Sequence, residues 1–278
     1  MKSHMAIDKT ATVDKVSKKQ QPTYINSPFT IAIEGMKLLF QKAPTLAIIL
    51  AILSALGASN YFSDRSNTNN APAPTVVGPD MDPAVVAVTI IVITVMLFGV
   101  LIFGSIIAGI FAFTSTELAK GRTVSFQQAT KATVDRLWSF VWLQLLMIGK
   151  IILWSLLFIV PGVIMAFRYS LANLSFFDSD KKLTGNAALK DSVTLTKNAW
   201  ITTFGAQVFF NIITLGLISP IIDTATKAIL YRQFVALEHD GKPKPAPHAL
   251  SWVALGLLIV VVIAVALGLT YGAIHYGM

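Results

Sequence analysis

Cysteine is absent from this chain of 278 residues, and charged residues make up only 13% of it. The lack of cysteine excludes disulfide bonds, thiol catalysis and thiolate metal sites. A soluble domain of this size usually has about 25% charged residues, so the low charged fraction argues against a soluble domain. Hydrophobic residues account for 54% of the sequence. This balance is typical of an integral membrane protein.

Motifs for common enzymes and cofactors are also missing. The sequence contains no H-E-x-x-H, G-x-S-x-G, G-x-x-x-x-G-K-[ST] or G-x-G-x-x-G motif. The four histidines are scattered, and none has another histidine three or four residues away, so we expect no metal site. We therefore predict a protein that is not an enzyme and has no catalytic residues, no cofactor and no metal.

Long apolar segments dominate the rest of the sequence. A transmembrane helix needs about 20 mostly apolar residues, and seven segments approach or exceed this length with few charges. We expect a transmembrane helix in each. These segments cover approximately residues 43–61, 83–118, 138–160, 161–177, 200–218, 220–237 and 249–276.

Three more polar segments are compatible with amphipathic helices. In the first of them, Phe29, Ile33, Met36 and Phe40 fall on one face, which suits a helix lying in the membrane interface. The sequence therefore predicts an all-α, polytopic membrane bundle of about seven transmembrane helices with three interfacial helices. The three polar segments cover residues 27–42, 122–137 and 183–199.

The distribution of Lys and Arg predicts the orientation of the chain. Nearly all of these residues lie in segments on one side of the predicted spans, whereas Arg65 stands between the first two spans. Cytoplasmic loops are enriched in Lys and Arg, so we place the N-terminus in the cytoplasm and the C-terminus outside. The predicted parts are a disordered cytoplasmic tail (1–26), a six-span core (27–238), a cytoplasmic loop (239–248) and an additional span (249–278).

The second and third groups of segments align at a constant offset of 59 residues. Pro161, which opens the fourth predicted span, aligns with Pro220, which opens the sixth, and Arg168 aligns with Lys227. A first copy is weaker, because Pro83 opens a span but no basic residue follows seven positions later. Apolar sequences can align by chance, but the shared prolines and cations favour a threefold helix–hairpin repeat with the last span added.

One stretch resembles a known family. The segment PGVIMAFRYSLANLSFFDSDKKLTGNAALKDSVTLTKNAW, from 161 to 200, resembles the signature of a large group of poorly characterised bacterial six-span inner-membrane proteins. Relatives of that group form the membrane domain of some glycerophosphodiester phosphodiesterases. The resemblance covers about residues 28–238 and implies a location in the bacterial cytoplasmic membrane, but it supplies no chemistry. It is carried by Pro161, Gly162, Arg168, Tyr169, Ala188, Leu189 and Ser192.

Four charged residues fall within the predicted spans. Lys150, Arg168 and Lys227 are cations, and Asp223 lies one turn before Lys227, where an i,i+4 pair can form. A charge near the bilayer centre costs at least about 2.5–3.5 kcal/mol on insertion scales. Such residues therefore normally face the protein interior and find a partner.

Two interpretations of these charges stay open. In the structural one, Asp223 neutralises one cation, Lys150 reaches the interface, and Arg168 binds backbone carbonyls at a helix end. In the functional one, the unpaired cations bind an anion, such as a lipid phosphate or a small anionic solute. Gln207 and Asn211, one turn apart, could add donors or could form ordinary interhelical hydrogen bonds.

The leading functional prediction is a non-enzymatic membrane protein that engages anionic phospholipid or organises the bilayer. The alternative is a transporter or channel for a small anion or amphiphile. Proline or glycine in the middle of spans would favour a transporter, but Pro161 with Gly162 and Pro220 cluster at the starts of spans, where they form turns. The basic loops lack interleaved aromatic residues, so nucleic acid is not an expected partner.

Overall fold

A computed structural model describes residues 24–63, 82–214 and 216–276. Regular structure over these residues is entirely α-helical, which confirms the predicted all-α class. Most of the predicted tail and Arg65 lie outside the described residues. The helices are α1 (Pro28–Lys42), α2 (Pro44–Ser63), α3 (Pro83–Ala119), α4 (Phe126–Val134), α5 (Leu137–Leu157), α6 (Ile159–Tyr169), α7 (Ala172–Phe177), α8 (Gly185–Leu195), α9 (Trp200–Ile213), α10 (Ser219–His239) and α11 (Ala249–Tyr276).

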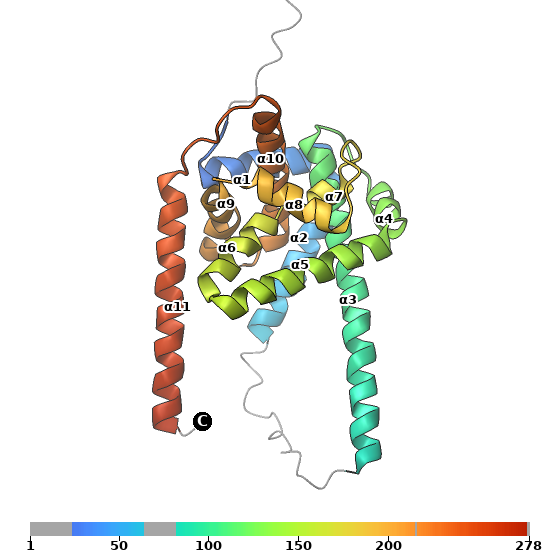
Figure 1. Cartoon of the computed structure of the whole chain (residues 1–278), viewed down its shortest axis with the longest axis vertical. Helices are drawn as coiled ribbons and strands as arrows, with labels where there is room; N and C mark the ends of the chain where they lie inside the picture. The colour runs from blue at the N-terminus through green and yellow to red at the C-terminus, as the bar shows by residue number, and fades with distance from the viewer. Residues whose placement is uncertain (1–23, 64–81, 215, 277–278) are drawn as a thin grey trace, which may run out of the picture.

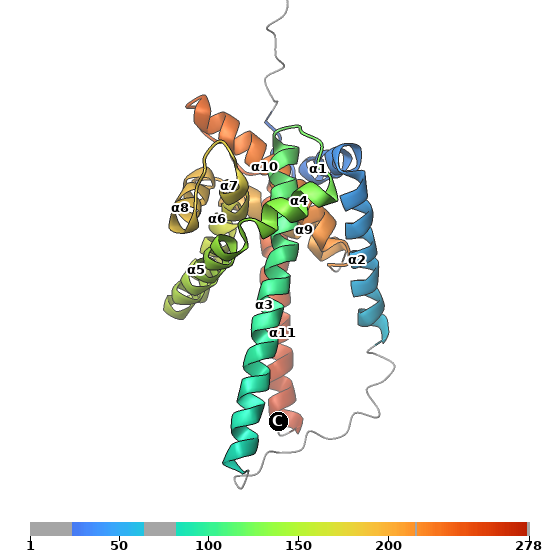
Figure 2. The same cartoon turned by 90° about the vertical axis from the view of Figure 1, so that its right-hand side faces the viewer.

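Two long apolar helices extend from a body of shorter helices. Helices α3 and α11 both run along the long axis of the molecule, on opposite sides of the body, and continue well beyond it (Figures 1 and 2). The start of α3 and the end of α11 lie at the same end of the molecule, opposite α1 and the end of α10 (Figure 1). Helices α5 and α6 lie obliquely to this axis and do not reach as far as the free ends of α3 and α11.

The sequence explains why α3 begins where it does and stays helical for 37 residues. The Asp82 side chain caps the helix by accepting a hydrogen bond from the Ala84 backbone N–H at 2.9 Å, and Pro83 fits the first turn. The hydroxyls of Thr89 and Thr94 donate to the carbonyls four residues before them, which satisfies their polar groups within apolar surroundings. At 1.5 Å per residue, α3 is about 55 Å long, more than a bilayer's hydrocarbon core requires.

Among the described residues, two helices are long and apolar enough to cross a membrane, namely α3 and α5. Helix α11 is counted with the shorter apolar helices, over Ala249–Val265. Helix α1 and residues 44–55 of α2 meet the criterion only together, and they are bent by 119°. The number of candidate spans is therefore two, or three if the bent pair forms one span. The predicted bundle of seven spans is not confirmed.

The fourth predicted span is wrong as a continuous helix. It divides into α6 and α7, because the carbonyl of Arg168 accepts hydrogen bonds from the hydroxyls of Ser192 and Thr196 at 2.7 and 3.2 Å. These bonds join the end of α6 to the end of α8. Moreover, α6 begins at Ile159, so Pro161 is its third residue and the turn after α5 lies at Phe158.

The fifth predicted span is also wrong, because α9 ends at Ile213 after 14 residues. Gly216 has a φ of 76°, a left-handed conformation that glycine adopts without strain. Its N–H donates to the carbonyl of Asn211 at 2.7 Å, which closes the end of the helix. The next helix, α10, does begin with Pro220 in its first turn, as predicted.

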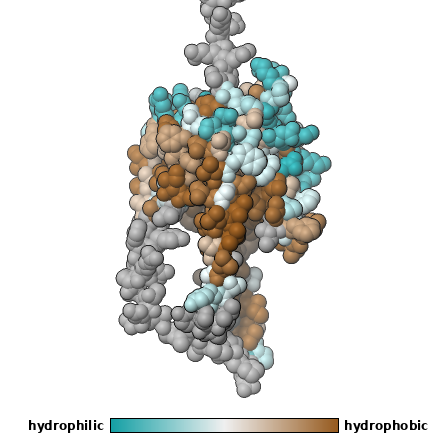
Figure 3. Space-filling model, turned by 90° about the vertical axis from the view of Figure 1, so that its left-hand side faces the viewer, coloured by the Kyte–Doolittle hydropathy of each residue, from teal (hydrophilic) through white to brown (hydrophobic). Residues whose placement is uncertain are grey.

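The core of the body forms around α10, whose buried side chains include Ile222, Ile229 and Phe234. Helix α1 crosses α10 at Gly35, and a Cβ added to Gly35 would lie 2.5 Å from the carbonyl oxygen of Ala225. This close approach of two backbones requires glycine. The surface is sorted by polarity, with hydrophilic residues at the top end and apolar residues below them on the face in Figure 3.

Replacing this glycine should therefore weaken the crossing. We expect Gly35→Ala to lower the free energy of unfolding by about 1–3 kcal/mol, because the added methyl group overpacks against a backbone carbonyl that has little room to move. Denaturant unfolding of the purified protein in detergent measures the change. The matched control is Gly104→Ala in α3, where an added Cβ meets nothing within 4 Å. Equal stability of the two variants would contradict the close crossing.

Candidate functional site

Lys150 lies beside a surface helix. It projects from α5, and its ammonium donates a hydrogen bond to Oδ1 of Asn186 in α8. Lys150 also borders a hollow between α5, α6 and α8, which we call the two-lysine depression. It has a volume of about 410 Å³ and is lined by Lys150, Met165, Tyr169, Leu189, Lys190, Val193 and Thr194.

Helix α8 is amphipathic and forms one wall of the two-lysine depression. Ala188, Ser192 and Leu195 are buried and attach α8 to the body, whereas Asn186 and Lys190 are exposed. Residues four apart lie on the same face of a helix, so Asn186 and Lys190 stand one above the other. The helix thus presents one lysine of its own and holds a second one from α5.

The lining of the two-lysine depression contains two cations and no carboxylate. The nearest acidic residue in the sequence, Asp191, is already engaged, because Lys181 donates to both of its oxygens at 2.9 and 2.8 Å. Met165, Leu189 and Val193 supply apolar wall, and the remaining lining residues are Tyr169 and Thr194. The arrangement is therefore positive and amphipathic, which matches a group with a phosphate at one end and hydrocarbon at the other.

Arg168 is half-buried at the end of α6. Its carbonyl holds α8, but its guanidinium forms no ion pair or hydrogen bond with any part of the chain that the structure describes. The expectation that Arg168 binds carbonyls at a neighbouring helix end therefore has no support among the described residues and stays a prediction. Arg168 lines neither of the two cavities described in this section.

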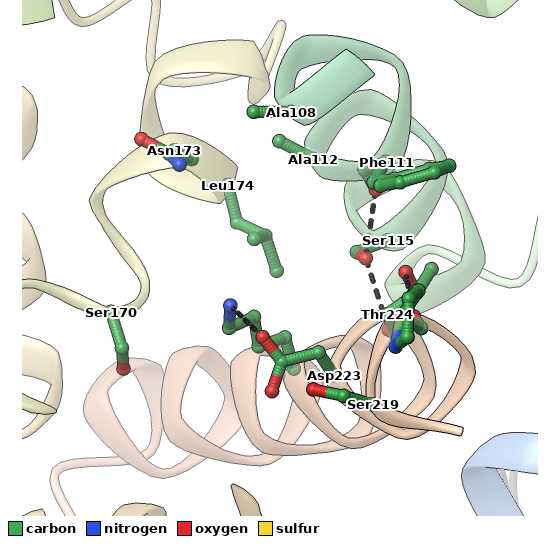
Figure 4. A pocket seen from close by; sticks show the side chains of 12 residues that line it. Ala108, Phe111, Ala112, Ser115, Ser170, Asn173, Leu174, Ser219, Asp223 and Thr224 are labelled. Atoms are coloured by element: carbon green, nitrogen blue, oxygen red, sulfur yellow. Dashed lines mark hydrogen bonds and ion pairs between the residues drawn. The ribbon is translucent and has the colours of Figure 1, made fainter. Parts of the chain in front are cut away.

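Lys227 lies elsewhere and forms the ion pair with Asp223 that the spacing predicts. The Lys227 ammonium is 2.8 Å from Oδ2 of Asp223. Both residues border a cavity of about 300 Å³ between α3, α7 and α10, which we call the ion-pair cavity (Figure 4). The predicted cations are thus not brought together in one site. The ion-pair cavity is lined by Ala108, Phe111, Ala112, Ser115, Ser170, Asn173, Leu174, Ser219, Pro220, Asp223, Thr224 and Lys227.

The remaining predicted residues have packing contacts. Gln207 donates to the hydroxyl of Ser170 at 3.2 Å, and Asn211 donates to the carbonyl of Gln207 at 2.6 Å, so these amides join α9 to the end of α6 and stabilise α9 itself. Gly162, which follows Pro161, lies so close to α5 that an added Cβ would overlap the Ser155 hydroxyl. Of the predicted residues, Pro161, Gly162, Gln207 and Asn211 line neither cavity.

Sequence reasoning missed a buried polar cluster at the polar end of the body. Asp178, directly after α7, accepts hydrogen bonds from the Lys120 ammonium at 2.5 Å and from the Tyr231 hydroxyl at 2.7 Å. Burial alone would raise the pKa of Asp178, but the hydrogen bonds from Lys120 and Tyr231 outweigh burial and hold the pKa of this carboxyl below its ordinary value of 3.8. The Asp-Ser-Asp sequence at 178–180 was the sequence feature that could have indicated this polar cluster.

Metal binding remains untested by the structure. Within residues 24–63, 82–214 and 216–276, no three His, Asp or Glu side chains gather closely enough to hold a metal ion. The predicted absence of catalytic residues and cofactors likewise stays a prediction.

Comparison of this chain with protein-family models, curated proteins and solved structures finds no match. The resemblance to the six-span bacterial family therefore stays a prediction as well. The function has to be inferred from the two cavities and from the surface that surrounds them.

The buried carboxylate of Asp178 should make a measurable contribution to stability. We expect Asp178→Asn to lower the free energy of unfolding at neutral pH by about 1–3 kcal/mol, because it leaves the ammonium of Lys120 without its buried partner. Denaturant unfolding in detergent checks this. The control is Asp180→Asn, which removes an exposed carboxylate that also pairs with Lys120 at 2.8 Å and should have a smaller effect.

The pH dependence tests the same interaction. A lowered pKa means that the stabilisation from Asp178 is complete above its ordinary pKa of 3.8 and is lost as the pH falls through the lowered pKa of the folded state. The unmodified protein should therefore lose more stability than Asp178→Asn when the pH falls from about 5 to about 3. Parallel pH profiles for the two proteins would show that the carboxylate is not held in its charged form.

Proposed function

We propose that this chain is a multi-pass protein of the bacterial cytoplasmic membrane that binds anionic phospholipid and does not catalyse a reaction. The observation that carries the proposal is the two-lysine depression, where Lys150 and Lys190 border an apolar hollow without a carboxylate. A lipid phosphate accepts hydrogen bonds from ammonium groups, and such charge-assisted bonds are the stronger class. The acyl chains extend along the exposed apolar surface of α5.

The position of the two-lysine depression supports a lipid as its ligand. Helix α8 is a short amphipathic helix, and α5 next to it exposes large apolar side chains, including Ile152 at 53% and Leu153 at 60%. Exposed apolar surface of this kind is suited to contact with hydrocarbon. Lys150 keeps its charge near the polar end by reaching to Asn186, as lysines in membrane proteins do when they snorkel.

The orientation belongs to the same proposal. Helices α1, α4 and α8 carry Lys residues and lie in the half of the molecule opposite the start of α3 (Figure 1). Because Lys and Arg favour the cytoplasmic side, this half faces the cytoplasm, and the free ends of α3 and α11 face outward. Anionic lipid of the inner leaflet then meets α8 directly.

The order of the helices supports the threefold repeat, which is part of the proposal. A short helix followed by two further helices occurs as α1–α2–α3, as α4–α5–α6 and as α8–α9–α10. Helices α4 and α8 begin at Phe126 and Gly185, which keeps the offset seen in the sequence. In this scheme α11 is the additional span, and the six-span resemblance describes the rest.

Removing the two ammonium groups tests lipid binding. We expect the double variant Lys150→Gln, Lys190→Gln to bind phosphatidylglycerol about tenfold or more weakly, because two charge-assisted hydrogen bonds are lost. Native mass spectrometry of the full chain in detergent, titrated with phosphatidylglycerol, measures the affinity. Glutamine at 150 keeps a donor for Asn186, so the fold should persist, as an unchanged thermal midpoint would show.

The matched control for this experiment is Lys37→Gln, which removes an exposed lysine from surface helix α1. It changes the net charge in the same direction but lies outside the two-lysine depression. If the double variant retains phosphatidylglycerol as well as Lys37→Gln does, the lipid-binding proposal is wrong.

One observation favours transport as a second candidate function. The break between α6 and α7 lies inside a predicted span and next to the ion-pair cavity, to which Ser170 and Asn173 contribute. Discontinuous helices that border a polar site are typical of secondary transporters. This candidate predicts that liposomes containing the protein take up a small organic phosphate faster than empty liposomes. Equal uptake rates for the two kinds of liposome would rule out transport of this solute.

A further inference from the structure

The ion-pair cavity has unused bonding capacity on both of its charged groups. A lysine ammonium has three N–H donors, and within the described chain Lys227 donates only to Oδ2 of Asp223. The second carboxylate oxygen of Asp223 accepts no hydrogen bond from any described residue. The side chains of Lys227 and Asp223 are 23% and 36% exposed, so both charges remain accessible.

One polar atom of the cavity lining also lacks a partner. The Oδ1 atom of Asn173 is buried and has no hydrogen-bond partner among the residues that the structure describes. Figure 4 shows Asn173 on the α7 side of the hollow, with its amide turned away from Asp223, and Ser170 at one edge of the hollow beside α10; the carboxylate of Asp223 is drawn with its ion pair. Ser115, by contrast, is satisfied, because its hydroxyl donates to the carbonyls of Phe111 and Thr224.

The net charge of the lining selects the ligand class. The ion-pair cavity contains one cation and one anion, so a purely anionic group would be repelled by Asp223 and a purely cationic one by Lys227. A group that carries both an ammonium and a phosphate can pair with both residues at once. The ammonium then bonds to the free oxygen of Asp223, and the phosphate accepts from the free N–H groups of Lys227.

An apolar stripe on α3 leads away from the cavity. Residues 11 apart lie on the same face of a helix after three turns, so Leu97 lies below Ala108, which lines the cavity. Gly104 lies between them on that face, and no atom stands within 4 Å of a Cβ added there. Leu97 is 65% exposed. Hydrocarbon attached to a group in the cavity therefore has an open apolar path along α3, which a water-soluble ligand would not use.

The geometry points to a binding site for a membrane phospholipid with a zwitterionic, phosphoethanolamine-type headgroup in the ion-pair cavity. Asp223 binds the ammonium, Lys227 binds the phosphate, and an acyl chain lies along the face of α3 that includes Gly104 and Leu97. The site is separate from the two-lysine depression, which lies against α8 and takes anionic lipid. It does not depend on the function proposed for that depression.

Titration of phosphatidylethanolamine onto the full chain in detergent tests the site by native mass spectrometry. Asp223→Asn should weaken phosphatidylethanolamine binding about tenfold or more, because the ammonium loses its charged acceptor. Phosphatidylglycerol, which has no ammonium, should bind this variant no more weakly than it binds the unmodified protein. The control Asp240→Asn removes the carboxylate of another ion pair, 3.0 Å from Lys242 and outside the cavity, and should change neither affinity.

A second variant serves if Asp223→Asn does not fold. Ala108→Phe leaves both charges in place but fills the hollow at the point where the headgroup meets the stripe, and it should also weaken phosphatidylethanolamine binding about tenfold or more. Unchanged phosphatidylethanolamine affinity in whichever of these variants folds would overturn the proposal. So would displacement of the lipid by an equal concentration of glycerophosphoethanolamine, since the site would then belong to a water-soluble solute.

The variants of the two-lysine depression separate the two proposals. Lys150→Gln with Lys190→Gln should leave phosphatidylethanolamine binding unchanged, whereas Asp223→Asn should leave phosphatidylglycerol binding unchanged. Loss of both lipids in either variant would overturn the assignment of two distinct headgroup sites.

Discussion

The carboxylate of Asp178 joins three parts of the chain that are far apart in the sequence. Lys120 follows the end of α3, Asp178 follows α7, and Tyr231 lies within α10, and all three meet through charge-assisted hydrogen bonds. Helix α3 has a long exposed apolar portion, so its position relative to the body depends on its last turns. Two further hydrogen bonds, from Ser115 to the Thr224 carbonyl and from Thr116 to the Leu174 carbonyl, support the same contact. In surroundings of low dielectric constant, such bonds are strong and costly to leave unmade.

Close approaches of backbones complete the body. Glycine stands where α1 crosses α10, at Gly35, where α3 meets α4, at Gly109, and where α9 meets α11, at Gly205. A Cβ at each of these positions would overlap a neighbouring atom. Helices that lie in lipid gain little from burying hydrophobic area, so in the proposed membrane setting close packing and hydrogen bonds hold the helices together. The small residues are therefore as important to this fold as the large apolar ones.

The same packing creates the two cavities. Because Ser192 and Thr196 bind the carbonyl of Arg168, the chain breaks after α6, and this break places Ser170 and Asn173 beside α10. Helix α8, held by these bonds, forms one wall of the two-lysine depression at the same time. One set of hydrogen bonds thus shapes two pockets of opposite character, one with two cations and one with a neutral ion pair. Their difference in charge is the physical basis for expecting two different headgroups.

Composition and local periodicity by themselves determined the all-helical class, the bounds of α3, α5 and α11 to within a few residues, and the pair between Asp223 and Lys227. These features depend on residues within one helix, so hydropathy and i,i+4 spacing are sufficient to predict them. Only the tertiary structure decided the break between α6 and α7, the contact of Lys150 with Asn186 and the cluster around Asp178. Their partners stand 24 to 58 residues apart in the chain, and no local pattern specifies which distant groups will meet.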